Sequence, residues 1–250
     1  IAQLGKAFRN EITPGNFIFR TREFEMMEIE YFVKESEWER YFAHWREEMM
    51  NWIQAVGIDK QKVHEVEIPQ GERAHYSKRT VDFEFEFPFG QKELYGLAYR
   101  GDFDLKNHQE ASGQKLMYRD PVSGEEFLPH TIEPTWGVDR TVLALLLSAY
   151  KKDEERVILS LPPRLSPIKV AVFPLLANKP DLVKKAHDLA KALRAKTVVS
   201  LDERGNIGKR YYAQDEVGTP WCLTIDFQTL EDQSVTVRWR DTAKQERISW

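Results

Sequence analysis

A proline-rich stretch near the middle of the chain, LSLPPRLSP at residues 159–167, separates two parts whose apolar residues follow different patterns. Before it, several runs alternate apolar and polar residues, most strictly TVDFEFEF at residues 80–87, which indicates half-buried strands of an antiparallel type. Beyond it, short apolar runs alternate along the chain with helical patterns, as in a parallel sheet with crossover helices. We therefore predict an α+β domain over residues 1–161 and a small α/β domain with a mostly parallel sheet over residues 168–250.

The first part begins with two expected strands around the turn Pro14-Gly15-Asn16, FIFR at residues 17–20 and EIEYFV at residues 28–33. Residues 37–56 carry large apolar side chains at helical spacing, which favours an amphipathic helix against the core over an aromatic binding stripe. KELYGLAYRGDFDL at residues 92–105 predicts another strand. The run at residues 127–150 predicts a strand that leads into an apolar helix near Asp139.

The second part predicts four strands and two helices. The strands are expected at residues 168–176, 197–202, 221–226 and 234–240, and the helices at residues 180–195 and 207–218. No internal repeat or low-complexity tract interrupts either part.

Composition sets limits on the class of protein. The formal net charge of -4 argues against a generally basic nucleic-acid surface but leaves room for a local basic patch. The single cysteine, Cys222, excludes an internal disulfide and predicts a reducing, cytoplasmic environment. No apolar stretch is as long as a membrane span, and no signal peptide opens the chain. Because the chain lacks an initiator Met, we expect it to be a piece of a longer protein.

Several chemistries lack the residues they need. The six histidines have no ligand spacing, so no zinc site is indicated. There is no G-x-S-x-G elbow, and Cys222 lies in an expected buried strand, so no nucleophile stands out. The glycines of GNIGKRY, residues 205–211, have the wrong spacing for a phosphate loop or a dinucleotide fingerprint.

Arginines at strand ends and at a helix start are what remains. They are Arg9, Arg20, Arg22, Arg100 and Arg140. A planar guanidinium that stays charged suits phosphate oxygens, and a helix N-terminus adds to that attraction. The alternative is that these arginines form surface ion pairs with nearby carboxylates. Spacing alone leaves both interpretations open. The carboxylates concerned are Glu11, Glu23, Glu93, Asp102 and Asp139.

Two short motifs favour the first interpretation. FRNE at residues 8–11 with FRTREF at residues 19–24 resembles motif two of the class II aminoacyl-tRNA synthetases, and GVDR at residues 137–140 resembles motif three. Longer segments narrow the resemblance, among them AHYSKRTVDF, YRDPVSGEEFLPHTIEPTWGVDR and GNIGKRYYAQDEVGTPW. The chain is similar to the dimeric, class II type of glycyl-tRNA synthetase along essentially its whole length. The resemblance covers the catalytic core from motif two onward and a C-terminal anticodon-binding domain.

The resemblance implies a fold, a reaction and partners. The fold would be an antiparallel class II sheet flanked by helices, followed by a small α/β anticodon-binding domain. The reaction would join glycine to tRNA(Gly) through glycyl-adenylate, with ATP and Mg²⁺ as cofactors. The intact enzyme would be a cytoplasmic homodimer with no membrane association. Motif one, which builds the dimer interface, and one more carboxylate for the glycine ammonium would lie upstream of Ile1.

The resemblance also assigns site residues. Arg9 and Arg140 would be catalytic, gripping the α- and γ-phosphates, and Glu93 would bind magnesium with ATP. The ATP site would comprise Arg9, Asn10, Glu11, Phe19, Arg20, Thr21, Arg22, Glu23, Phe24, Glu93, Leu94, Gly137, Val138, Asp139 and Arg140. The glycine site would comprise Phe24, Glu25, Met26, Met27, Glu28, Arg100, Glu133, Pro134, Thr135, Trp136 and Gly137.

Within these sets, Thr135 with Trp136 beside it would form the wall that excludes larger amino acids. The sequence departs from the usual family pattern at Thr135, Trp136 and Met26. In the second domain, basic residues near element ends are the expected anticodon contacts: Lys209, Arg210, Arg238 and Arg240.

The alternative to a glycyl-tRNA synthetase is a non-catalytic, synthetase-like nucleic-acid-binding accessory protein. Such a protein would have little reason to keep the arginines and the two carboxylates Glu28 and Glu133.

Overall fold

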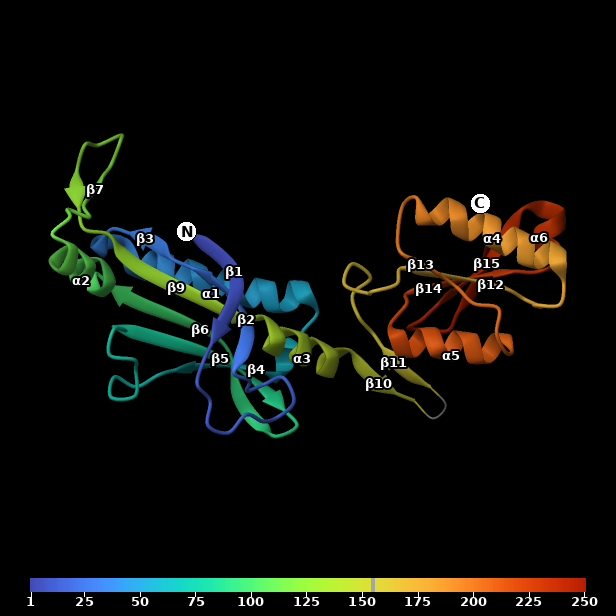
Figure 1. Ribbon diagram of the computed structural model, residues 1–250, viewed down its shortest axis with the longest axis horizontal. Coiled ribbons are helices and arrows are strands. Elements are labelled where there is room, and N and C mark those ends of the chain that lie inside the picture. Colours follow the sequence, from blue (N-terminus) through green and yellow to red (C-terminus); the bar gives the residue numbers. More distant parts are fainter. Residues whose placement is uncertain (154–155) are drawn as a thin grey trace. The chain divides into compact units, whose positions relative to one another are not determined.

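The computed structural model describes residues 1–153 and 156–250, which form two compact units, Ile1–Leu147 and Ser148–Trp250 (Figure 1). Among the described residues, no helix combines the length and apolar character needed to cross a membrane.

An antiparallel sheet forms the centre of the first unit. Its strands run in the order β1-β2-β9-β6-β5-β4, and the short strand β3 also pairs with β9. Every pairing is antiparallel, which confirms the predicted fold class. The strands are β1 (Ala2–Phe8), β2 (Glu23–Ile29), β3 (Tyr31–Val33), β4 (Val63–Glu67), β5 (Arg79–Phe87), β6 (Gly90–Gly101) and β9 (His130–Gly137).

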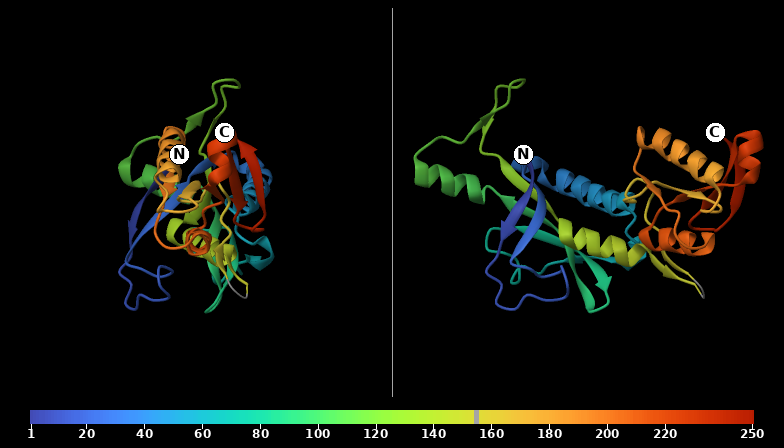
Figure 2. Two further views of the ribbon diagram at one scale, coloured as in Figure 1. Left: turned by 90° about the vertical axis from the view of Figure 1, so that its right-hand side faces the viewer. Right: turned by 45° about the vertical axis from the view of Figure 1, so that its right-hand side comes forward.

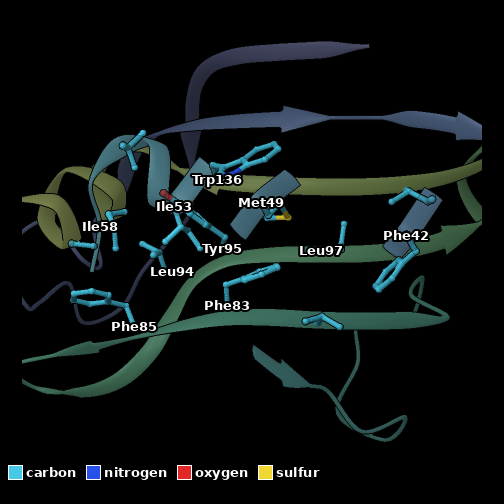
Figure 3. Packing of buried hydrophobic residues seen from close by; sticks show 14 of the residues in the cluster. Phe42, Met49, Ile53, Ile58, Phe83, Phe85, Leu94, Tyr95, Leu97 and Trp136 are labelled. Carbon is cyan, nitrogen blue, oxygen red and sulfur yellow. The ribbon is translucent and has the colours of Figure 1, made fainter. Parts of the chain in front are cut away.

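One face of this sheet packs on helix α1 (Trp38–Val56), as the helical spacing predicts. The buried side of α1 meets the side chains that strict alternation on β5 turns inward, such as Phe83 and Phe85, so that Phe42, Met49 and Ile53 are almost completely buried (Figure 3). A left-handed Gly57, at φ 85°, ends the helix, where a residue without Cβ is favoured. The opposite face of the sheet points away from α1.

The remaining elements of the first unit lie around the sheet. Between β6 and β9 the chain forms a helix and a small hairpin, which extends away from the sheet in both views (Figures 1 and 2). The elements are the 3-10 turns η1 (Glu35–Glu37) and η2 (Lys60–Lys62), α2 (Phe103–Ser112), β7 (Tyr118–Arg119), β8 (Glu126–Phe127) and α3 (Val138–Ala149). The expected passage from strand to helix near Asp139 is confirmed.

The predicted strand at residues 17–20 is wrong. These residues form turns between β1 and β2, and Asn16 and Phe17 adopt left-handed backbone conformations with φ of 55° and 58°. Such angles are incompatible with a strand. Only Phe19 of the FIFR run is buried, packed edge-on against Phe87 and Phe89. The aromatic run therefore anchors a loop instead of extending the sheet.

The second unit has a five-stranded sheet in the order β13-β12-β14-β15-β16. β12 pairs in parallel with β13 and β14, whereas β15 and β16 are added antiparallel, so the sheet is mixed and not mostly parallel as predicted. The strands are β12 (Val170–Pro174), β13 (Val199–Leu201), β14 (Trp221–Ile225), β15 (Ser234–Trp239) and β16 (Gln245–Ser249). The sequence patterns anticipate the first four strands but not β16.

Helices cover both faces of this sheet (Figure 1). Val172 of β12 turns toward α4 (Pro180–Arg194), and its neighbours Ala171 and Phe173 turn toward α5 (Ile207–Val217). A short helix α6 (Phe227–Asp232), which was not predicted, follows β14. The hairpin of β10 (Tyr150–Lys152) and β11 (Val157–Leu159) also belongs to this unit, because β11 packs on α5. The structural division thus precedes the proline-rich stretch.

Candidate active site

The face of the first unit's sheet that points away from α1 carries polar side chains from neighbouring strands. Strand pairing sets Glu28 opposite Thr135, and Thr135 opposite Gly96 on its other side. Because side chains alternate between faces, Glu133 and Gly137 lie on the same face as Thr135. This face therefore carries carboxylates next to positions with little or no side chain.

A concave pocket lies on this face and encloses about 590 Å³ of space that is partly open to solvent. The structure brings fourteen of the predicted site residues to its lining: Arg9, Glu11, Phe19, Arg20, Thr21, Phe24, Glu25, Met26, Glu93, Leu94, Thr135, Gly137, Asp139 and Arg140. Three lining residues were missed, Ile18, Tyr95 and Gly96. The sequence could have revealed Gly96, because a glycine inside a strand pattern marks a close approach of a ligand or of another backbone.

One wall of the pocket is the loop between β1 and β2. Arg9 is exposed and lies over the Phe24 ring, 5.4 Å from its centre, and among the described residues no carboxylate pairs with it. The Arg20 guanidinium donates to both Glu11 oxygens at 3.2 Å, and Arg22 Nε donates to the Glu11 carbonyl at 3.0 Å. The loop thus holds two arginines in fixed positions and leaves the Arg9 guanidinium free to accept an anion.

The opposite wall is the start of α3, which directly follows Gly137. Arg140 lies over the Phe19 ring at 4.2 Å, and its Nε and Nη1 donate to the carbonyls of Phe19 and Glu93. Its guanidinium is also 3.2 Å from a Glu93 carboxylate oxygen. Asp139 accepts the backbone N–H of Glu25 at 3.0 Å, which ties the helix start to β2. These contacts hold the start of α3, with its GVDR motif, against β2 and the loop between β1 and β2.

The ion-pair interpretation of the arginines is therefore partly right. Arg20 pairs with Glu11 and Arg140 with Glu93, but Glu23 and Asp102 pair with Lys6 and Lys78 instead. The pairs with Glu11 and Glu93 lie in the pocket lining, where a bound anion would meet the same arginines.

Three glutamates converge at the other end of the polar face. Glu28, Glu30 and Glu133 each have a carboxylate oxygen within 4.8 Å of the others. Arg100 Nη1 donates to Glu133 at 2.7 Å, and its Nε and Nη2 donate to Asp104 at 2.7 and 2.8 Å. Burial, followed by the neighbouring Glu28 carboxyl, raises the pKa of Glu133 to about 7, and Arg100 opposes this shift. Glu30, whose part was not predicted, has a pKa raised by burial and then by Glu133.

A second unpredicted carboxylate lies beside Glu93. Asp82 on β5 and Glu93 both direct an oxygen over Gly96, at 3.9 and 3.8 Å from the point where a Cβ would be. Burial raises the pKa of Asp82 to about 6, with Glu93 and Glu84 adding to the shift. In the sequence Asp82 belongs to the alternating polar residues of TVDFEFEF and cannot be told from solvent-facing glutamates.

Trp136 is not part of the predicted glycine wall. It is 7% exposed and packs against Trp45 and Tyr95 on the α1 side of the sheet (Figure 3). Met27, its pairing partner, packs against the same core. Thr135 and Trp136 are adjacent in a strand, so their side chains must point to opposite faces. The same alternation turns Pro134 away from the site. The other predicted site residues that do not line the pocket are Asn10, Arg22, Glu23, Val138 and the three residues of the carboxylate cluster, Glu28, Arg100 and Glu133.

Three of the four basic residues expected to contact an anticodon are buried, so the prediction is wrong for them. Arg238 donates to both oxygens of the fully buried Asp215, at 2.8 and 2.9 Å. Arg210 and Arg240 donate to backbone carbonyls of their own unit. Of that set only Lys209 is exposed. Basic residues at element ends look alike in sequence, whether they bind a partner or stabilise the fold.

Sequence comparison agrees with the class of protein that this fold and site define. Residues 1–150 match the family described as tRNA synthetase class II core domain (G, H, P, S and T), and residues 169–250 match the anticodon binding domain. The chain therefore belongs to the class II aminoacyl-tRNA synthetases.

Within that class, the chain is similar to proteins named glycine--tRNA ligase. It is 52% identical over its whole length to the one from Streptomyces coelicolor, 51% to that from Thermobifida fusca, and 48% over 99% of its length to that from Alkaliphilus oremlandii. It covers 56%, 56% and 54% of those proteins, so it spans about half their length. The predicted resemblance to glycyl-tRNA synthetases is confirmed, and the accessory-protein alternative is not favoured.

Proposed function

We propose that this protein ligates glycine to tRNA(Gly) in two steps, with ATP as the energy source. A glycine carboxylate oxygen attacks the α-phosphorus of ATP, a new phosphorus–oxygen bond forms, and pyrophosphate leaves. A hydroxyl of the terminal tRNA adenosine then attacks the carbonyl carbon of glycyl-adenylate and releases AMP. The observation that carries the proposal is one pocket that joins Arg9, Phe24, Glu93 and Arg140 on a class II core.

The two arginines of the pocket have different roles. Arg9 has no carboxylate partner among the described residues, so its charge is available to the α-phosphate and the attacking carboxylate. Arg140 is held by two carbonyls at the start of α3, where its charge and the helix dipole both favour the γ-phosphate. Phosphoryl chemistry of this kind depends mostly on positioning and on charge stabilisation, which fixed guanidinium groups supply. The Phe24 ring stacks on adenine.

Magnesium fits the pocket through Glu93. The Glu93 carboxylate is half exposed at the pocket edge, and a hard oxygen ligand of this kind with substrate phosphates is the usual environment of Mg²⁺ in proteins. When bound, the ion neutralises phosphate charge and orients the pyrophosphate leaving group. Arg140 Nη1 lies 3.2 Å from a Glu93 carboxylate oxygen, so a cation held by Glu93 would meet the same end of ATP as the guanidinium.

Glycine is held at its carboxylate by Arg9 and at its ammonium by two glutamates. Glu28 and Glu133 accept its ammonium, with Arg100 fixing the Glu133 carboxylate. Thr135 pairs with Glu28 across the strands and lines the pocket, and it would form the wall that meets the Cβ of a larger amino acid. By analogy with the family, the nucleic-acid partner is tRNA(Gly), which the second unit reads in part. The protein would act as a homodimer in the cytoplasm.

The test is glycine-dependent exchange of pyrophosphate into ATP, measured on the full-length protein. Arg9→Ala should lower the exchange rate at least ~10²-fold, the scale of losing one preorganised charge-stabilising group. Arg119→Ala is the matched control, because Arg119 is exposed on β7 outside the pocket. Normal exchange in the Arg9→Ala variant would remove the assigned role, and absence of any glycine-dependent exchange in the unmodified protein would refute the function.

A further inference from the structure

The carboxyl group of Glu133 is surrounded by charged groups from several elements. Glu28 and Glu30 approach it from β2 and the residue after it, and Arg100 approaches from β6 while also binding Asp104 of α2. The cluster thus has four carboxyl groups and one guanidinium, which makes it strongly deficient in positive charge.

Arg100 cannot neutralise this cluster. Two of its nitrogens are used by Asp104 and a third by Glu133, and its planar group stacks over Tyr76 at 3.9 Å. Among the described residues, no cationic side chain forms an ion pair with Glu28 or Glu30. Carboxylates this close to one another repel, which favours retention of a proton within the cluster.

We propose that Glu30 is a positioning residue of the amino-acid site, which keeps a proton shared between Glu28 and Glu133 until the substrate ammonium replaces it. This inference rests on the proposed function and deepens it. Glycine enters with its ammonium charged, three N–H groups meet the carboxylates, and the shared proton leaves to solvent. Glu30 acts through the pair, because its negative charge makes the deprotonated pair costly while the site is empty.

The sign of the pH effect follows from this exchange. An ammonium favours the deprotonated pair, so bound glycine lowers the pKa of the pair, and a lower pH must weaken glycine binding. Burial and Glu28 raise the pKa of Glu133 to about 7, so the effect falls near neutral pH. With that midpoint, glycine binding releases about 0.8 proton at pH 6.5 and almost none at pH 8.5, and the KM for glycine is about tenfold higher at pH 6 than at pH 8.5.

Proton release tests the exchange directly. Glycine binding to the full-length protein is followed by calorimetry at pH 6.5 and 8.5 in buffers of different ionisation enthalpy. Release at pH 6.5 that disappears at pH 8.5 is the expected result. Glycine binding at pH 6.5 without proton release overturns the inference but leaves the proposed function intact. Absence of glycine binding and of glycine-dependent exchange at every pH refutes the proposed function, and the inference with it.

Variants test the part of Glu30. In Glu30→Gln the pair should lose its proton more easily, so the midpoint of the KM profile for glycine should move down by at least ~0.5 pH unit and the ratio of KM at pH 6 to pH 8.5 should fall from about 10 to about 4 or less. Glu30→Asp keeps the charge and should restore most of the original profile. Glu47→Gln, exposed on α1, is the matched control. An unchanged midpoint in Glu30→Gln, with normal thermal unfolding, would exclude Glu30 from this role.

Discussion

The buried ion pair of the second unit gives a prediction of stability whose size follows from the structure. Asp215 is fully buried and Arg238 is 3% exposed, and the two join through paired hydrogen bonds of 2.8 and 2.9 Å. Arg156 adds a weaker contact to Asp215 at 3.3 Å. The substitution Asp215→Asn keeps the size of the side chain but removes its charge, and leaves the Arg238 guanidinium buried without a counterion.

The free energy of unfolding should fall by about 3–5 kcal/mol, the range for removing one partner of a buried ion pair. A Coulomb estimate agrees, since two unit charges about 4 Å apart attract by about 4 kcal/mol at an effective dielectric constant of about 20. The pair need not stabilise the fold in net terms, because burying both charges is itself costly. Replacing both, as in Asp215→Leu with Arg238→Met, should therefore recover a large part of the loss.

Cys222 provides the assay. It is the single cysteine of the chain, is 1% exposed and lies on β14 directly opposite Arg238. Burial raises the pKa of its thiol to about 12, so it reacts with a thiol reagent only when the second unit opens. Since each 1.4 kcal/mol is a factor of ten, Asp215→Asn should speed labelling of Cys222 by about 10²- to 10⁴-fold under conditions where opening is a rapid equilibrium.

Glu216→Gln is the control, because Glu216 is the exposed neighbour of Asp215 on α5 and its change should alter the labelling rate by less than about threefold. If Asp215→Asn accelerates labelling less than about fivefold, the guanidinium is not left uncompensated, and the assignment of Arg238 to the interior of the fold is wrong.

Three further predictions concern the proposed activity. Arg140→Ala should raise the KM for ATP in pyrophosphate exchange by at least ~10-fold, since it removes one charge at the γ-phosphate; an unchanged KM for ATP would contradict its role. Thr135→Gly should reduce the preference for glycine over alanine, which one methyl group sets at ~1–3 kcal/mol in a site it can enter, whereas Trp136→Phe should leave that preference unchanged. The reverse pattern would mean that the wall is on the other face. Lys209→Ala should weaken tRNA binding and lower the slope of log affinity against log salt by about one, and equal slopes would exclude a phosphate contact.

Local patterns in the sequence determine much of the fold. The helical spacing in residues 37–56 predicts α1 closely, and the strict alternation of TVDFEFEF predicts β5, because both encode which face of an element is buried. The motifs FRNE, FRTREF and GVDR also predict which residues meet in the pocket. They do so through resemblance, since no local property brings residues 9 and 140 together.

Where a pattern has two solutions, the sequence by itself does not choose. The FIFR pattern predicts a strand, but the run forms turns in which Phe19 packs against Phe87 and Phe89, far along the chain. Trp136 follows Thr135 in a motif that suggests a shared role, yet the pleat of β9 separates their side chains.

Charged residues depended most on tertiary structure. Arg238 is chemically the same as an exposed arginine until Asp215 faces it from α5, and only the packed fold removes both from water. Glu133 is far along the chain from Glu28 and Glu30, and the three carboxyl groups approach one another because β2 and β9 pair in one register. Amino-acid types and local periodicity determine which elements form and which faces they bury. The environment of a charge depends on groups distant in sequence, so its partners and its proton are decided only when those elements have packed.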